Sequence, residues 1–259
     1  MTSPPETAPG YFAKYENFAL DRTSSGVLTL RFHTNGGPAT FTGRMHSDLP
    51  HLLDDIAFDR ENKVLVLTGT GDRFMTDIDG ASLGDVTKPM TFDVSYMEGR
   101  RILQRFVDME IPIVAAVNGP ATVHSEYALL ADYIVASETT TFSDYPHLTF
   151  GIVPGDGLQI IWEEVLGLNR ARSLILTQGS FTAGEAKSWG VVAELVTQNM
   201  VLSRAMEIAE KIAVRPQLLN RYIVITIRQR LSRRMAEGTA LGMALESLTA
   251  ANLAYINPH

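Results

Sequence analysis

The sequence contains no cysteine, and this absence excludes several kinds of chemistry. Disulfide bonds, metal centres held by thiolates and a thiol nucleophile all require that side chain. An excess of positive charge is also missing, because 22 Lys and Arg stand against 29 Asp and Glu, a net charge of -7. Nucleic acids and anionic membranes are bound by basic surfaces, so we expect neither as a partner.

Long apolar runs are absent as well. No stretch approaches the roughly 18 apolar residues that span a bilayer. Residues 1–10 have neither the basic nor the apolar segment of a secretory signal, and their proline-rich, small-residue character predicts a disordered lead-in. We therefore expect a cytoplasmic protein. Its 259 residues are 45% hydrophobic and 20% charged, a balance typical of a globular chain with a large core.

Strand and helix patterns alternate over residues 11–197, the predicted core domain. Two strand-like runs separated by a polar turn predict a hairpin at 15–21 and 26–33. Buried strands are predicted at 63–68, 111–117, 133–137 and 191–196, and helices at 42–58, 92–109 and 125–131. Pro50 conflicts with the first helix unless that helix begins or kinks near Ser47. The alternation predicts an α/β fold that binds ligands beyond the carboxyl ends of its strands, where the loops at 69–83, 118–126 and 144–157 would lie.

After the last predicted strand the pattern becomes purely helical. Apolar periodicity predicts three helices, at 200–214, 217–234 and 237–255. Three successive helices with no returning strand cannot cover a sheet alone. We therefore expect residues 198–259 to form a helical subdomain that also supplies an oligomer interface.

One loop carries two groups capable of acid–base chemistry. His147 and Asp156 stand nine positions apart in a stretch shaped by Pro146, Pro154 and several glycines. An imidazole with an unperturbed pKa of about 6.5 is suited to proton transfer near neutral pH. Each residue also has a purely structural interpretation, since a histidine after proline is commonly solvated or capping and Asp156 could cap a helix starting near Gly157.

The arrangement resembles the crotonase (enoyl-CoA hydratase/isomerase) superfamily over nearly the whole chain. Its markers are VLVLTG at 64–69, PIVAAVNG at 112–119 and PHLTFGIVPGDG at 146–157. The resemblance implies a ββα spiral core with a C-terminal helical trimerisation region. It also implies assembly as a homotrimer or, as a dimer of trimers, a hexamer.

Three departures separate the chain from relatives that process CoA thioesters. Those relatives carry a Gly-Gly-Gly turn whose N–H binds the thioester oxyanion, where this chain has PATVHSE at 120–126. The second oxyanion loop is shortened to FMTDID at 74–79, and His147 replaces the usual glutamate. In these features the chain is similar to a small branch containing 6-oxocamphor hydrolase and other β-diketone hydrolases. The resemblance implies retro-Claisen hydrolysis of a C–C bond between two carbonyls, yielding a keto acid, without CoA, cofactor or metal.

The resemblance also implies roles for individual residues. His147 would be the general base that activates water, and Glu246 in the last helix would orient it. Asp156 would protonate the enolate carbon or share the orienting role, and His124 would donate a hydrogen bond to the carbonyl oxygen. Glu126 stands where a hydratase-type acid would fall and is a reserve candidate.

Apolar side chains are expected to form the substrate-binding walls, which favours an apolar and cyclic substrate. The candidates are Phe41, Phe74, Met75, Phe92, Tyr96 and Trp162. Phe41 corresponds to a tryptophan that lines the pocket of the camphor enzyme, so the indole N–H donor of that position is missing.

Three alternatives remain open from the sequence. The first is a CoA-thioester enzyme, a hydratase, isomerase or decarboxylase. The second is a metal site built from His124, His147, Asp156 and Glu246, although no local ligand spacing supports it. The third is a non-catalytic crotonase-like scaffold whose trimer surface is its function.

Overall fold

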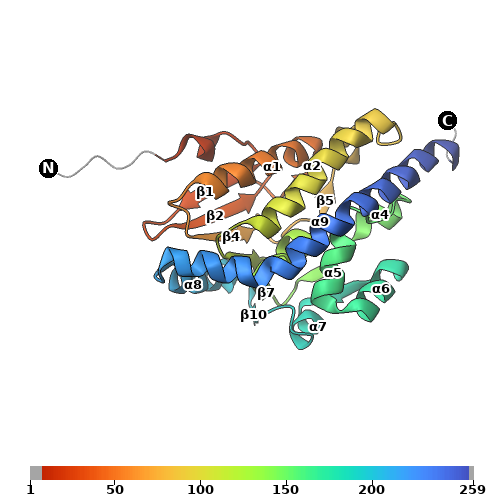
Figure 1. The fold of residues 1–259 in the computed structure, drawn as a ribbon. Helices are drawn as coiled ribbons and strands as arrows, with labels where there is room; N and C mark the ends of the chain where they lie inside the picture. The colour runs from red at the N-terminus through yellow and green to blue at the C-terminus, as the bar shows by residue number, and fades with distance from the viewer. Residues whose placement is uncertain (1–7, 257–259) are drawn as a thin grey trace.

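A six-stranded sheet organises the fold (Figure 1) of the computed structural model, which describes residues 8–256. Its order is β1 (Phe18–Arg22), β2 (Val27–Phe32), β4 (Val64–Thr68), β6 (Ile113–Val117), β7 (Tyr133–Ser137) and β10 (Glu194–Val196). The first pair is the predicted antiparallel hairpin and all later neighbours are parallel, so the α/β class is confirmed. Of the predicted lead-in, residues 1–7 lie outside the described residues, and the short helix η1 (Gly10–Ala13) begins at Gly10.

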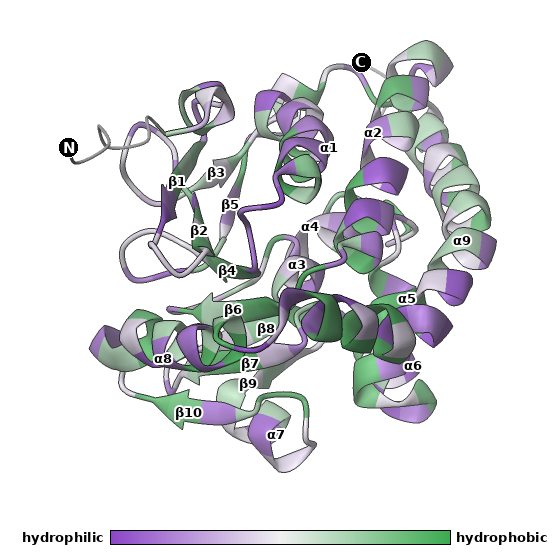
Figure 2. Ribbon diagram, turned by 60° about the vertical axis from the view of Figure 1, so that its left-hand side comes forward, coloured by the Kyte–Doolittle hydropathy of each residue, from purple (hydrophilic) through white to green (hydrophobic). Residues whose placement is uncertain are grey.

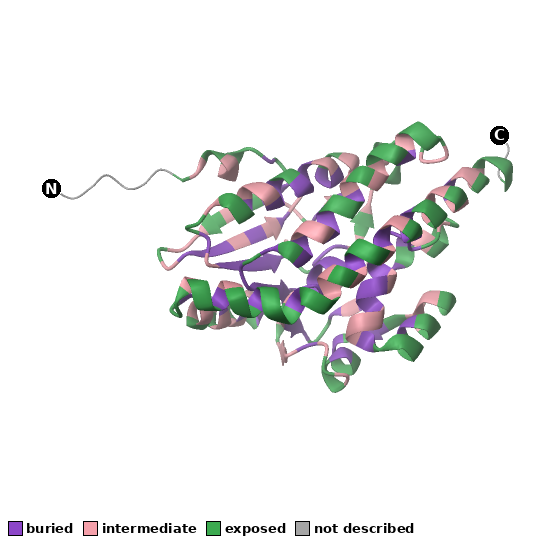
Figure 3. Ribbon diagram, in the orientation of Figure 1, coloured by how far each residue is buried: buried purple, intermediate pink, exposed green. Residues whose placement is uncertain are grey.

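The central strands are buried on both faces, as their continuous apolar sequences predict. On one face, the β-branched side chains of Val66 and Val114 pack against α8 (Val201–Ala213), which presents Ala205 and Ala209. On the other face, the strands pack beneath α1 (Gly43–Phe58) and α2 (Pro89–Asp108) in the main core. β6 is hydrophobic along its length (Figure 2), whereas α8 and α9 expose their outer faces (Figure 3).

The remaining elements are short and lie outside the six-stranded sheet. They include two small strand pairs, β3 (Thr40–Phe41) with β5 (Asp77–Ile78) and β8 (Thr141–Ser143) with β9 (Ser180–Thr182). The short helices are η2 (Gly80–Leu83), α3 (Ser125–Leu129), α4 (Tyr145–Thr149), α5 (Leu158–Leu166), α6 (Leu168–Thr177), α7 (Ala183–Ser188) and η3 (Gln198–Met200). The helix predicted at 42–58 runs from Gly43 straight through Pro50, with Thr42 as its N-cap.

The prediction of two separate C-terminal helices is wrong, because residues Gln217–Ile256 form one continuous helix, α9. Met235 and Thr239 are buried where the break was expected, and Gly238 leaves room for Ile160 of α5. The two helices of this segment pack against different parts of the core. α8 is the layer over one face of the sheet, and α9 lies along α2 (Figure 1).

A partly buried ion pair fixes α9 to the sheet. The guanidinium of Arg228 donates to Asp132 Oδ1 at 2.8 Å and Oδ2 at 2.5 Å, and to the Met109 carbonyl oxygen at 2.6 Å. Asp132 also accepts from the backbone N–H of Ile113 in β6 at 2.8 Å. The first half of α9 is thereby held against the sheet, while its second half extends over the loop that follows α4. Within the described residues, no helix has the length and apolar character needed to cross a membrane.

Candidate active site

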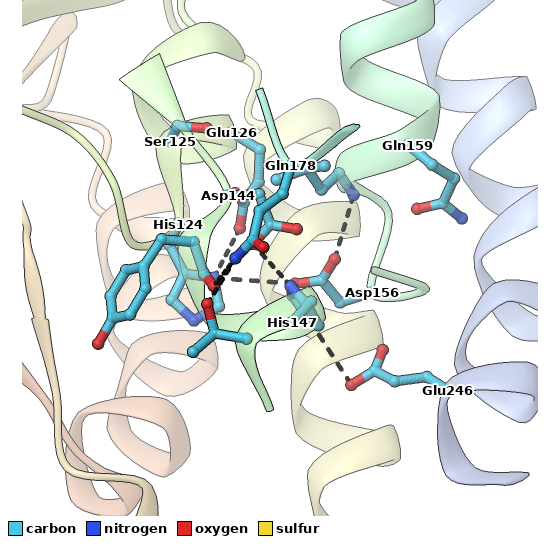
Figure 4. A network of polar contacts seen from close by, with 12 residues as sticks. His124, Ser125, Glu126, Asp144, His147, Asp156, Gln159, Gln178 and Glu246 are labelled. Atoms are coloured by element: carbon cyan, nitrogen blue, oxygen red, sulfur yellow. Dashed lines mark hydrogen bonds and ion pairs between the residues drawn. The ribbon is translucent and has the colours of Figure 1, made fainter. Parts of the chain in front are cut away.

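A cavity of about 590 Å³ lies where the loops after β4, β6 and β8 meet, which confirms their predicted convergence. Helix α9 completes its wall. Six of the cavity's titratable side chains, from four parts of the chain, form one cluster: His124, Glu126, Asp144, His147, Asp156 and Glu246 (Figure 4). Most of the remaining lining residues are apolar, so the titratable groups face one another across an otherwise apolar cavity.

His147 is held by a partner that sequence reasoning missed. It lies on the short helix α4, whose first turn contains Pro146, rather than in an irregular loop. Its Nδ1 is 2.7 Å from Oδ1 of Asp144, three residues earlier. We expected Glu246 to make this orienting contact. Instead Oε1 of Glu246 lies 3.9 Å from the other ring nitrogen, Nε2.

Asp156 performs a structural role with one oxygen and faces the cavity with the other. Its Oδ1 accepts the backbone N–H of Leu158 at 3.2 Å, at the start of α5. Its Oδ2 lies 3.9 Å from His147 Nε2 and 3.8 Å from His124 Nδ1. One oxygen therefore orders the backbone at the start of α5, where Gly157 is the N-cap, and the catalytic role of the other stays a prediction.

Two glycines bring the Asp156 loop and the Glu246 helix into backbone contact. A Cβ on Gly155 would overlap the carbonyl oxygen of Gly242, and a Cβ on Gly242 would overlap that of Gly155. Glu246 follows one helical turn after Gly242. The two carboxyl groups consequently flank His147 from adjoining backbones.

His124 precedes α3 with a left-handed backbone, φ 49° and ψ 47°, which side chains other than glycine seldom adopt. Its ring lies 4.1 Å from the ring of Phe41 and is parallel to that of Tyr127 at 4.8 Å. Its Nδ1 is 2.7 Å from Oε1 of Glu126, a carboxyl group that is only 1% exposed. The site thus contains a second imidazole–carboxyl pair beside that of His147.

The electrostatics of the cluster favour retention of protons. Burial lowers the pKa of His147, but Asp156, Asp144 and Glu246 outweigh it and raise that pKa to about 10. Burial raises the pKa of Glu246 to about 8, against the opposing effect of His147. Burial likewise raises the pKa of Glu126. At neutral pH the cluster therefore binds more protons than the same groups would in water.

The predicted pocket walls divide into two groups. Phe41 and Phe92 line the cavity. Phe74, Met75 and Trp162 are fully buried in the core and Tyr96 lies on α2, and none of these four is among the lining residues. Other apolar side chains, which we did not predict, complete the wall: Ile78, Leu83, Val86, Leu103, Phe150, Ile152, Met243 and Leu253.

The geometry also bears on the metal alternative. His124, Glu126 and Asp156 each bring one potential ligand atom within 4.8 Å of the others. However, two ligands of one tetrahedral zinc ion are separated by about 3.3 Å. The 2.7 Å between His124 Nδ1 and Glu126 Oε1 is a hydrogen-bond length and favours a proton between them.

The backbone donors of the two segments that would form a thioester oxyanion hole are bonded to each other. The N–H groups of Phe74 and Met75 donate to the Pro120 carbonyl oxygen at 2.9 and 3.2 Å. The N–H groups of Thr122 and Val123 donate to the Met75 carbonyl oxygen at 2.9 and 3.2 Å. These four N–H groups are therefore not free to hold a substrate carbonyl.

Comparison with known proteins gives two kinds of relative. The enoyl-CoA hydratase/isomerase family model matches residues 22–252. The chain is 33% identical over 199 residues to a probable peroxisomal enoyl-CoA hydratase of Arabidopsis thaliana, covering 74% of this chain and 71% of that protein. It is 31% identical over 159 residues to a carnitinyl-CoA dehydratase of Salmonella typhimurium, covering 60% of this chain and 59% of that enzyme, less than two thirds of its length.

Among solved structures, the chain is similar to a β-diketone hydrolase from the cyanobacterium Anabaena sp. PCC 7120 bound to (S)-3-oxocyclohexyl acetic acid. The TM-score is 0.94 and the identity 47%, covering 96% of this chain and 99% of that one. An enoyl-CoA hydratase/isomerase from Mycobacterium paratuberculosis has a TM-score of 0.84 at 22% identity, covering 91% and 94% of the two chains, a likeness of fold alone.

Proposed function

The chain belongs to the enoyl-CoA hydratase/isomerase (crotonase) family, and within that family we propose that it hydrolyses a C–C bond of an apolar, cyclic β-diketone. The observation that carries this proposal is the setting of His147. Its Nδ1 is bound to Asp144, and its Nε2 faces Asp156 and Glu246 across 3.9 Å in each case. The likeness to the Anabaena β-diketone hydrolase over 96% of the chain supports it.

In the proposed reaction His147 removes a proton from water. The hydrogen bond to Asp144 places the ring proton on Nδ1, which leaves the lone pair of Nε2 toward the cavity. The raised pKa of His147 means that the ring must first release its second proton. The Glu246 carboxylate, 3.9 Å from Nε2, can accept that proton in a step that is uphill, because its pKa of about 8 is lower than that of His147. Neutral His147 beside protonated Glu246 is the form that activates water.

His124 supplies the donor for the oxygen of the attacked carbonyl. The backbone N–H groups of Thr122 and Val123 already donate to the Met75 carbonyl oxygen, so the hydrogen bond to the substrate oxygen comes from a side chain instead. A donor that hydrogen-bonds the developing oxyanion contributes roughly 10²–10³ in rate. The ring of Phe41, 4.1 Å from His124, excludes water from this bond.

Collapse of the tetrahedral intermediate breaks the C–C bond. The attacked carbonyl leaves as a carboxylic acid, and the other fragment leaves as an enolate stabilised by the second carbonyl. The proton taken by His147 passes to the enolate carbon through Asp156, whose Oδ2 lies 3.9 Å from Nε2. Water is consumed and a keto acid is released, so the atoms and charges balance with no redox partner.

The second candidate function is a reaction of CoA thioesters, favoured by the sequence similarity to the Arabidopsis enzyme. The glutamate expected for that chemistry is replaced by His147, and Glu126 is bound to His124. Four backbone N–H groups of the two loops, those of Phe74, Met75, Thr122 and Val123, are bonded within the protein. These observations favour the diketone reaction.

The test is a hydrolysis assay on a panel of cyclic and bicyclic 1,3-diketones, following loss of enol absorbance. We expect turnover by the wild type and a loss of roughly 10²–10⁴-fold in His147→Ala. His51→Ala, an exposed histidine on α1, is the matched control and should retain full activity. A panel without turnover, together with hydration of an enoyl-CoA ester, would overturn the proposal.

We also propose that the protein assembles as a homotrimer or a pair of trimers. Apolar side chains that a monomer leaves in water support this, and they recur along α9: Leu218, Leu219, Tyr222, Ile223, Leu241, Leu245 and Leu248. Sedimentation velocity tests the proposal, and a monomer at micromolar concentration would contradict it.

A further inference from the structure

Glu126 is the most deeply buried carboxyl group of the site, with 1% of the residue exposed. Its Oε1 is 2.7 Å from Nδ1 of His124, whereas its Oε2 has no hydrogen-bond partner among the described residues. A buried carboxylate is costly unless it is compensated. The hydrogen bond to His124 is therefore the principal interaction by which the protein accommodates this group.

We propose that Glu126 is a positioning residue that shares one proton with His124 and thereby keeps a proton on Nε2 of that ring. The inference rests on the proposed function, because it explains how the donor for the substrate carbonyl is maintained. It gives Glu126 a role different from that of an acid acting directly on substrate.

The shared proton between His124 and Glu126 can lie in two places. In the first, His124 is an imidazolium whose Nδ1–H donates to the carboxylate of Glu126. In the second, the protonated carboxyl group of Glu126 donates its O–H to Nδ1, and the neutral ring must then carry its own proton on Nε2. Nε2 is a donor in both arrangements. It loses its proton only when the pair as a whole is deprotonated.

The surroundings favour retention of that proton. Phe41 and Tyr127 place aromatic rings against the ring of His124, and aromatic faces attract a cation. Asp156, on the loop before α5, lies 3.8 Å from Nδ1 and adds a further carboxyl group. Burial of the ring and the nearby His147 of α4 each lower the pKa of His124. Glu126 and Asp156 outweigh both effects and raise the pKa of His124.

This role would let a half-buried histidine do the work of a backbone donor. A backbone N–H is always a donor, whereas a neutral imidazole donates from only one nitrogen. Pairing Nδ1 with a buried carboxyl group removes that ambiguity. The side chain then behaves as a permanent donor, as the backbone groups of Thr122 and Val123 would if Met75 did not bind them.

The first measurement needs no substrate. Protein labelled with ¹⁵N-histidine is examined by long-range ¹H–¹⁵N NMR between pH 6 and 9, with His124→Gln used to assign the signals of His124. We expect Nε2 of His124 to be protonated throughout. In Glu126→Gln the pKa of His124 should fall by about one unit or more, because the carboxylate that stabilises the cation is lost. A bare Nε2 at neutral pH in the wild type, or an unchanged titration in the variant, would overturn the inference.

The matched control is Glu98→Gln. The carboxyl group of Glu98 lies 2.8 Å from Nδ1 of His46, so the same chemical change is made in a second histidine–glutamate pair. It should alter the signals of His46 and leave those of His124 in place. If Glu126→Gln does not fold, the wild-type spectra alone decide, because the proton on Nε2 is observed directly.

Kinetics supply the second measurement. For a diketone that the wild type cleaves, Glu126→Gln should lower kcat by about 10²-fold, with KM changed less than about threefold, because the hydrogen bond strengthens in the transition state. Glu126→Asp keeps the charge and should restore part of the loss. Unchanged kcat in Glu126→Gln contradicts the inference. A wild type that cleaves no diketone contradicts the proposed function, while the spectra still test the proton on Nε2.

Discussion

Gly155 and Gly242 lie in direct backbone contact, so that a Cβ on either residue would overlap the carbonyl oxygen of the other. This contact joins the loop that carries Asp156 to the helix that carries Glu246. The separation of the two carboxyl groups on either side of His147 is therefore set by two residues without side chains.

Gly242→Ala should lower both stability and activity. The added methyl group meets the Gly155 carbonyl oxygen, which cannot rotate away, and overpacking of this kind costs about 1–3 kcal/mol in the free energy of unfolding. Displacement of the loop should also lower kcat/KM by about tenfold or more. Urea unfolding and the diketone assay measure the two effects. Gly184→Ala in α7, where a Cβ meets nothing closer than 3.9 Å, is the control and should match the wild type in activity.

Asp144→Asn should change the pH dependence of the reaction as well as its rate. The Asp144 carboxylate raises the pKa of His147, so its removal lowers that pKa. The acid limb of the kcat/KM profile should then move to lower pH, since the base becomes neutral earlier. The rate on the plateau should fall by about 10²–10⁴-fold, because the tautomer of the ring is no longer selected. An unshifted acid limb would remove Asp144 from this role, and Asp93→Asn, on the exposed face of α2, serves as the control.

Stability should decline as the pH rises from about 5 to 8, in part because of Glu246. Burial raises its pKa in the folded protein to about 8, from the ordinary value of 4.5 that it has in the unfolded chain. Between these values the folded protein holds a proton that the unfolded chain releases, so raising the pH favours unfolding. Glu246→Gln should flatten this decline in urea unfolding measured at several pH values. Glu61→Gln, at an exposed position, should leave the slope as in the wild type.

Arg228→Met should cost about 3 kcal/mol in the free energy of unfolding, because it leaves the buried Met109 carbonyl oxygen without its donor and the partly buried Asp132 carboxylate without its cation. Arg230→Met, two residues later on α9, removes a guanidinium that is 79% exposed in its pair with Glu164. Its cost should be about 0–1 kcal/mol. Equal losses in the two variants, measured by urea unfolding, would show that α9 does not depend on the contacts of Arg228.

The sheet could be predicted from sequence because its strands are short apolar runs bounded by glycine, proline and asparagine, as at 113–117. Helix α9 could not be divided correctly, because Gly238 resembles a helix break but instead accommodates Ile160. The distinction depends on a neighbouring helix, which a local pattern does not contain.

The site was predictable where it rests on family motifs, as with His147, Asp156 and His124, which all line the cavity. Asp144 was missed because its contact with His147 exists only once the chain turns into α4. The spacing of three residues around Pro146 was the available signal. Trp162 was misplaced for the opposite reason, since a large aromatic ring fits a pocket wall and a core equally well, and here it is buried beside Ser125.

The left-handed backbone at His124 limits which residues can replace it. Glycine takes this conformation freely, and histidine is among the few other residues that tolerate it. A glycine at this position would therefore keep the same backbone conformation without strain. His124→Gly consequently deletes the imidazole while leaving the course of the loop unchanged, so the variant separates the chemical role of the ring from the conformational role of the residue.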